Sequence, residues 1–121
     1  MENAKVIIIE DDPMTREDCR LNLEVRNHVI VGEAGTVGQA EQLIDSLQSA
    51  EVDLAVVDGN LSRGAVDGAE GEHIAGLIHV KLPGVVVVGC SLDGQVRGAD
   101  INVRKGDSWA LDALVTKLER P

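Results

Sequence analysis

The sequence predicts an α/β fold in which helices cover both sides of a parallel sheet. Short segments rich in Val, Ile and Leu alternate with amphipathic segments along the whole chain. Two of these apolar segments, residues 54–57 and 85–88, contain no alternating polar residues, which is typical of strands buried on both faces. Strands that alternate with helices form a parallel sheet, because each helix carries the chain across the sheet to the next strand.

The first half of the chain predicts two strands and two helices. Residues 4–9 predict the first strand, and Asp12, followed by proline, is typical of the N-terminus of a helix that extends to about residue 27. Residues 29–31 predict a short second strand. Thr36 and Gln39 have the spacing of a capping box, and the helix that they begin has one apolar face, made of Ala40, Leu43, Ile44 and Leu47.

The second half of the chain predicts three more strands and two more helices. Residues 52–58 predict a strand that ends in an acidic residue, and the three glycines within residues 61–71 predict a loop after it. Further strands are predicted over residues 85–89 and 100–103. Two helices are predicted from apolar faces at helical spacing, which are Ile74, Leu77 and Ile78 in one and Leu111, Leu114, Val115 and Leu118 in the last.

Composition and charge restrict the classes of function. The chain has 121 residues, 44% of them hydrophobic, which suits one globular domain over residues 1–121. A net charge of −10 disfavours binding to nucleic acid or to an anionic membrane, and no signal peptide or membrane-spanning segment is apparent.

Cys19 and Cys90 form neither a disulfide framework nor a metal motif, so we expect the chain to lie in a reducing cytoplasm. The histidines lack ligand spacing and are expected at the surface, at His28, His73 and His79.

Polar side chains follow four of the predicted strands at the point where each strand ends. Glu10 and Asp11 follow the first strand. Asp58 ends the third strand and Ser91 ends the fourth strand. Lys105 follows the fifth strand. Right-handed crossovers bring these ends to one edge of the sheet. Three carboxylates there repel one another, and Mg²⁺ would relieve the repulsion because it binds oxygen ligands. A carboxylate can also accept a phosphoryl group, whose oxygens the lysine and the serine hydroxyl would then stabilise.

Each of these residues also has an ordinary structural interpretation. Asp58 could start a turn with the glycine and asparagine that follow it. The acidic residues after the first strand could merely favour a helix N-terminus. Ser91 could lie in a turn, and Lys105 could be a solvated charge. The location of the whole set at strand ends favours a shared site over these separate explanations.

The segments that carry these residues resemble the receiver domains of two-component response regulators. The matching segments span the chain and are IIIEDDPMTR, VDLAVVDGN, PGVVVVGCS, GAD and the lysine of VRKG. Arg16 supports the alignment, because family members often have an arginine five residues after the second acid. The resemblance implies a flavodoxin-like (βα)5 fold, with five parallel strands in the order 2-1-3-4-5.

The resemblance also implies a role for each residue of the set. Asp58 would be the phospho-acceptor, Ser91 the switch hydroxyl, and Lys105 the lysine that pairs with the phosphoryl group. The implied cofactor is Mg²⁺, and its implied ligands are Glu10, Asp11, Asp58 and the main-chain carbonyl oxygen of Asn60.

Several positions differ from the usual receiver pattern. Gly106 replaces the proline after the lysine, and Leu92 replaces a small residue after the switch hydroxyl. Asn102 replaces the aromatic switch residue, and its amide would need hydrogen-bond partners if it turned inward. The segment Leu92–Ala99 is too short for an average helix. We therefore expect the fourth helix of the family to be missing or very short.

The resemblance implies a stand-alone cytoplasmic receiver that accepts a phosphoryl group on Asp58 from a sensor histidine kinase or a phosphotransfer protein. It would not be an enzyme acting on other substrates, and it would be a monomer or weak dimer that signals through an output protein which the sequence does not identify. The alternative is a degenerate receiver that acts as a phosphorylation-independent interaction module, which the altered switch and lost helix favour. A small-molecule hydrolase fits poorly, because no general base or substrate pocket is apparent.

Overall fold

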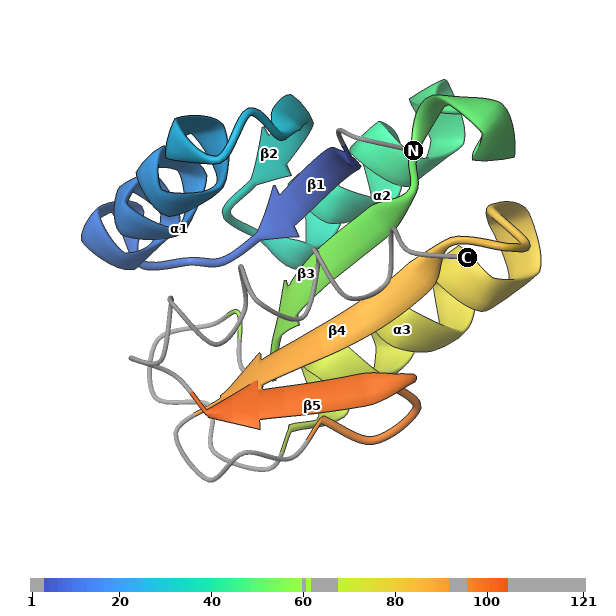
Figure 1. Ribbon diagram of the computed structural model, residues 1–121. Coiled ribbons are helices and arrows are strands. Elements are labelled where there is room, and N and C mark those ends of the chain that lie inside the picture. The colour runs from blue at the N-terminus through green and yellow to red at the C-terminus, as the bar shows by residue number, and fades with distance from the viewer. Residues whose placement is uncertain (1–3, 60, 62–67, 92–95, 105–121) are drawn as a thin grey trace.

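A five-stranded parallel sheet forms the centre of the structure (Figure 1). The computed structural model describes residues 4–59, 61, 68–91 and 96–104. The strand order is β2-β1-β3-β4-β5, with every neighbouring pair parallel, which confirms the predicted fold class. The strands are β1 (Lys5–Ile9), β2 (Val29–Ala34), β3 (Leu54–Asp58), β4 (Val86–Ser91) and β5 (Ile101–Arg104). The last predicted helix lies outside the described residues.

The described helices lie on both sides of this sheet, and α1 covers the side opposite to α2 and α3 (Figure 1). Their bounds are α1 (Pro13–Val25), α2 (Val37–Ser46) and α3 (Ala69–Lys81), with a short 3-10 helix η1 (Ser49–Glu51) before β3. The Thr36 side chain accepts the Gln39 N–H at 3.1 Å, as predicted, whereas the Gln39 side chain accepts the N–H of Gly35 rather than that of Thr36. None of the described helices is long and apolar enough to cross a membrane.

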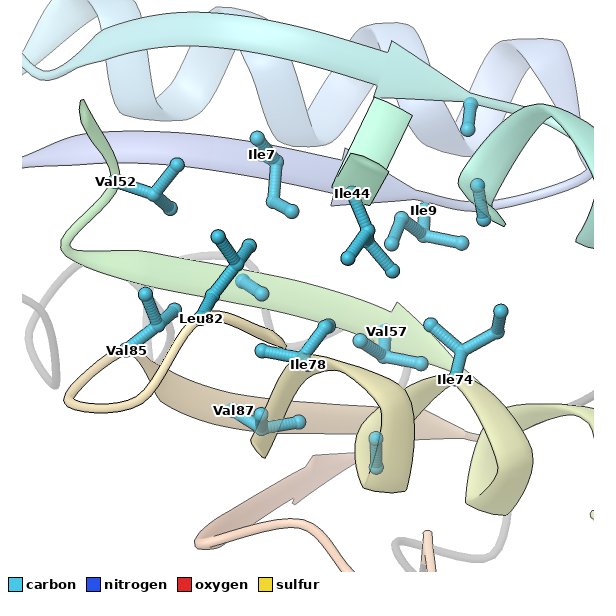
Figure 2. Close-up of a cluster of buried hydrophobic side chains, with 14 of the residues drawn as sticks. Ile7, Ile9, Ile44, Val52, Val57, Ile74, Ile78, Leu82, Val85 and Val87 are labelled. Carbon is cyan, nitrogen blue, oxygen red and sulfur yellow. The ribbon is translucent and has the colours of Figure 1, made fainter. Parts of the chain in front are cut away.

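Two apolar cores result from the alternation of side chains along the strands. On one side of the sheet, Ile7 and Ile9 of β1 pack with Ile44 of α2 and with Ile74 and Ile78 of α3 (Figure 2). On the other side, a second cluster lies under α1 and contains Val6, Ile8, Leu23, Leu54, Val56 and Val88. Burial on both sides explains why β1, β3 and β4 have nearly continuous apolar sequences.

Three sequence predictions are wrong in part. The second strand continues to Ala34 instead of ending at residue 31, because Gly32 gives the Leu43 side chain room to pack against it. The predicted loop over residues 61–71 ends earlier, since α3 begins at Ala69. His28 is buried, not exposed, because its Nδ1 accepts the Ala4 N–H at 3.1 Å beside the turn that leads into β2.

The connection between β4 and β5 is short, as predicted, and its described residues 96–100 form a turn and no helix. Val96 is buried against Gly89 of β4, where an added Cβ would lie 2.5 Å from the Val96 Cβ. The Asn102 Oδ1 accepts the Val96 N–H at 2.7 Å. The Asp100 N–H donates to the Val87 carbonyl at 2.9 Å, and the Asp100 carboxylate accepts the Val87 N–H at 2.8 Å. The turn therefore packs directly on the sheet.

The turn is also joined to α3 by an ion pair and a hydrogen bond. Arg97 pairs with Glu72 at 3.2 Å, and His79 contacts the Asp100 carboxylate at 3.0 Å. Burial raises the pKa of Asp100, but the hydrogen bonds from His79 and from the Val87 N–H outweigh it and hold this pKa below its ordinary value. These contacts tie the shortened connection to the helix that follows β3.

The substitution Gly89→Ala tests the close packing of Val96 against β4. We expect this substitution to lower the free energy of unfolding by about 1–3 kcal/mol, because the added methyl group would overlap Val96 and Asn102. Gly76→Ala is a matched control at an exposed position of α3, where nothing lies within 4 Å of the added Cβ. It should stabilise the protein by about 0.5–1 kcal/mol. Urea unfolding measures both, and a Gly89→Ala protein as stable as the original would contradict the packing described.

Candidate metal centre

Three carboxylates meet at the carboxyl edge of the sheet. Glu10 and Asp11 directly follow β1, and Asp58 is the last residue of β3, the neighbouring strand. Each of the three offers a carboxylate oxygen within 4.8 Å of the other two. Glu10 and Asp58 are buried, with exposed fractions of 5% and 3%, and Asp11 is partly buried. The structure thus brings together the three acidic side chains that the sequence singled out.

Arg16 holds the main chain where this acidic segment begins. Its Nη1 donates to the Glu10 carbonyl oxygen at 2.9 Å, and its Nε pairs with Glu33 at 3.5 Å. Gly35 leaves room for this guanidinium, because an added Cβ there would lie 2.7 Å from Nη1. The Glu10 N–H also donates to the Ala34 carbonyl at the end of β2, at 3.0 Å. Both peptide groups of Glu10 are therefore fixed by neighbouring elements.

Asp12 has a structural role that separates it from the cluster. Its carboxylate accepts the Met14 N–H at 3.4 Å and the Thr15 hydroxyl at 2.5 Å, which makes it the N-cap of α1. The helix-cap interpretation of the sequence is therefore right for Asp12. The neighbouring Asp11 instead contributes its carboxylate to the cluster.

The spacing and chemistry of the three carboxylates suit a hard divalent cation. Oxygens on opposite sides of a Mg²⁺ ion lie about 4.2 Å apart, from metal–oxygen distances of about 2.1 Å. The three oxygens of the cluster lie within 4.8 Å of one another, so small movements or bridging waters would complete the coordination. Carboxylates this close, two of them buried, repel one another strongly, and a cation removes that cost.

The first turn of α3 contacts the residues that follow Asp58. The Gly71 N–H donates to the Gly59 carbonyl at 3.0 Å, and the Leu61 N–H donates to a Glu70 carboxylate oxygen at 2.8 Å. The sequence did not single out Glu70, because the surrounding glycines indicated a loop. The signal that could have identified it is an acidic residue close to a helix N-terminus.

Cys19 and Cys90 lie on the α1 side of the sheet, close to the acidic cluster. Cys90 of β4 is the register partner of Asp58, and both thiols pack against the core beneath α1. Burial raises the pKa of the Cys19 thiol to about 12, with smaller contributions from the negative charges of Cys90, Glu10, Asp18 and Glu33. Cys19 is therefore a neutral, hydrophobic side chain at neutral pH.

The remaining predicted site residues are described only in part or not at all. Ser91 ends β4 and pairs in register with Arg104 of β5, so its main chain lies at the same edge of the sheet as the cluster. Nothing is described of its side chain. Asn60 and Lys105 lie outside the described residues, as do Leu92 and Gly106.

The Cys19 thiol predicts a loss of stability at alkaline pH. Its pKa in the folded chain is raised from 9.0 to about 12, so ionisation favours the unfolded chain as the pH rises through this interval. We expect the free energy of unfolding to fall by up to about 1.4 kcal/mol per pH unit above about pH 9 from this group. Cys19→Ala should remove that part of the slope in urea unfolding. Equal slopes in the two proteins would contradict the prediction.

Comparisons with known proteins agree on the fold. No protein-family model and no curated protein sequence gives a significant match. The signal receiver domain of NarL from Mycobacterium tuberculosis superposes with a TM-score of 0.73 at 23% identity, over 98% of this chain and 97% of that one. A CheY-like response regulator receiver domain protein from Methanospirillum hungatei JF-1 superposes with a TM-score of 0.77 at 19% sequence identity. The match covers 96% of this chain and 93% of that one. The receiver domain of PhyR from Erythrobacter litoralis superposes with a TM-score of 0.69 at 21% sequence identity, and the match covers 100% of this chain and 96% of that one.

These structural neighbours cover nearly the whole of this chain and of their own described chains. At such low identity the comparison establishes a common fold, and the activity has to be argued from the site itself. The strand order 2-1-3-4-5 is the order of the flavodoxin-like folds, which bind their ligands at the carboxyl edge of the sheet. The chain has the fold of the receiver domains of response regulators, as the sequence resemblance predicted.

Proposed function

We propose that this chain is a signalling receiver that accepts a phosphoryl group on Asp58 from a histidine kinase or a phosphotransfer protein. The observation that carries the proposal is the meeting of Glu10, Asp11 and Asp58 at the carboxyl edge of a receiver-type sheet. The transfer forms a bond between an Asp58 carboxylate oxygen and phosphorus. The phosphorus–nitrogen bond of the donor phosphohistidine breaks, and the imidazole nitrogen keeps the electron pair.

The other residues of the proposed site would bind the cation or the phosphoryl oxygens. Glu10 and Asp11, with the main-chain carbonyl of Asn60, would hold Mg²⁺ beside Asp58. A bound Mg²⁺ ion supplies positive charge at the phosphoryl oxygens. The Ser91 hydroxyl and the Lys105 ammonium would complete the contacts with the phosphoryl group.

The proposed setting is a cytoplasmic two-component system. The domain over residues 1–121 would act as a monomer or weak dimer and pass its signal to an output protein. It would promote only its own phosphorylation and dephosphorylation and would not act on other substrates. The net charge of −10 supports protein partners over nucleic acid or membrane.

A second function is favoured by the contacts of Asn102. In receivers the aromatic ring at this position moves inward when the domain is phosphorylated, but the Asn102 amide oxygen already accepts the Val96 N–H. An interaction module that works without phosphorylation would need no such movement. If this candidate is right, the affinity of the chain for a partner protein is the same with and without a phosphodonor.

Intact mass spectrometry tests the proposed phosphorylation. With a small phosphodonor and Mg²⁺, we expect one phosphoryl adduct on the original protein and none on Asp58→Asn, because the amide lacks the carboxylate that accepts the phosphoryl group. A chelator should prevent the adduct, because the acidic cluster repels a phosphate dianion unless a cation is bound. Asp45→Asn is a matched control that removes an exposed carboxylate from α2 and should leave the adduct unchanged. An adduct that persists in Asp58→Asn, or that forms equally well with a chelator, would refute the assignment.

A further inference from the structure

The N-terminal turn of α3 lies directly against the peptide that follows Asp58. An added Cβ at Gly71 would be 2.6 Å from the Gly59 Cα and 2.7 Å from the Asp58 carbonyl oxygen. No side chain fits at that distance from main-chain atoms, so glycine permits the contact. The Gly71 N–H uses this approach to donate to the Gly59 carbonyl at 3.0 Å. The helix thus contacts the main chain of the phospho-acceptor strand without an intervening side chain.

Glu70 makes the second contact between this turn and the segment after β3. Its carboxylate accepts the Leu61 N–H at 2.8 Å, and the Leu61 side chain is itself buried in the core, with 4% exposed. A hydrogen bond to a carboxylate is about twice as strong as one between neutral groups. Two consecutive residues of the helix therefore bind this segment. The Gly71 N–H binds Gly59, and the Glu70 side chain binds Leu61.

A general preference for negative charge at a helix N-terminus would also explain an acidic residue here. Glu72 provides the comparison, because it lies in the same turn of α3. Its side chain is about half exposed and pairs with Arg97 of the β4–β5 turn. Glu70 instead reaches back towards β3, so its contact goes beyond what the helix dipole requires.

We propose that Glu70 is a positioning residue that holds the segment after Asp58 in the geometry needed for cation binding. This inference rests on the proposed function in one respect, namely that Asp58 and its neighbours bind a divalent cation. The carboxylate of Glu70 acts through the Leu61 N–H and does not itself touch the cation. Loss of that hydrogen bond removes one of the two described hydrogen bonds between this segment and the first turn of α3, and weakens the cation site.

Two conservative substitutions separate this role from a simple effect of charge. Glu70→Gln keeps the reach and an acceptor oxygen but removes the charge, whereas Glu70→Asp keeps the charge but is one methylene too short to reach Leu61. Mn²⁺ is the probe, and the loss of its free-ion electron paramagnetic resonance signal measures binding. Glu72→Gln is the matched control, because it removes one charge from the same turn of α3. Circular dichroism checks that each variant is folded at the temperature of the titration.

We expect the Mn²⁺ dissociation constant to rise about tenfold in Glu70→Asp and to stay within about threefold of the original in Glu70→Gln and Glu72→Gln. The opposite order, with Glu70→Gln the weaker binder, would mean that charge alone matters and would overturn the inference. Unchanged binding in folded Glu70→Asp, or no Mn²⁺ binding by the original protein, would also overturn it. If the original protein binds Mn²⁺ but forms no phosphoryl adduct, the proposed function fails and the ranking of the Glu70 variants still decides the inference.

Discussion

The mutual repulsion of three carboxylates at one edge of the sheet is the constraint on which the arrangement of the site depends. Glu10 and Asp58 are buried, so their charges cannot be fully screened by water. Neighbouring elements hold the main chain on both strands. Arg16 binds the Glu10 carbonyl, and the first turn of α3 binds Gly59 through Gly71. A rigid frame of this kind keeps like charges close together, which favours the binding of a cation between them.

The short β4–β5 connection changes the other half of the receiver fold. Val96 packs on Gly89, and the turn over residues 96–100 is bonded to both β4 and α3. Asn102 stands where receivers usually have an aromatic switch residue, and its amide is part of this packing. The proposed signal would therefore have no aromatic ring to move at this position. The contacts that are described lead from Asp58 through Gly59 to α3, and from α3 to the turn.

Much of the fold could be predicted from sequence, because buried strands and amphipathic helices have distinct periodicities. The sequence also located the acids, since residues that end parallel strands must meet at one edge. It failed where tertiary contacts decide the local structure. Gly71 looked like a loop residue, and only its approach to Gly59 explains a glycine inside a helix. His28 looked exposed, because nothing in the sequence indicates that its ring accepts the Ala4 N–H. Glu70 was missed because its partner is a main-chain group.

We propose that the carboxylates of Glu10, Asp11 and Asp58 form a binding site for a divalent cation, and that Asp58 is also the residue that would accept the phosphoryl group. The most direct measurement is anomalous X-ray diffraction from a crystal of this chain grown with Mn²⁺. We expect one strong anomalous peak within coordination distance of carboxylate oxygens from Glu10, Asp11 and Asp58. A map with no peak at this position, or with its strongest peak on carboxylates elsewhere on the surface, would contradict it.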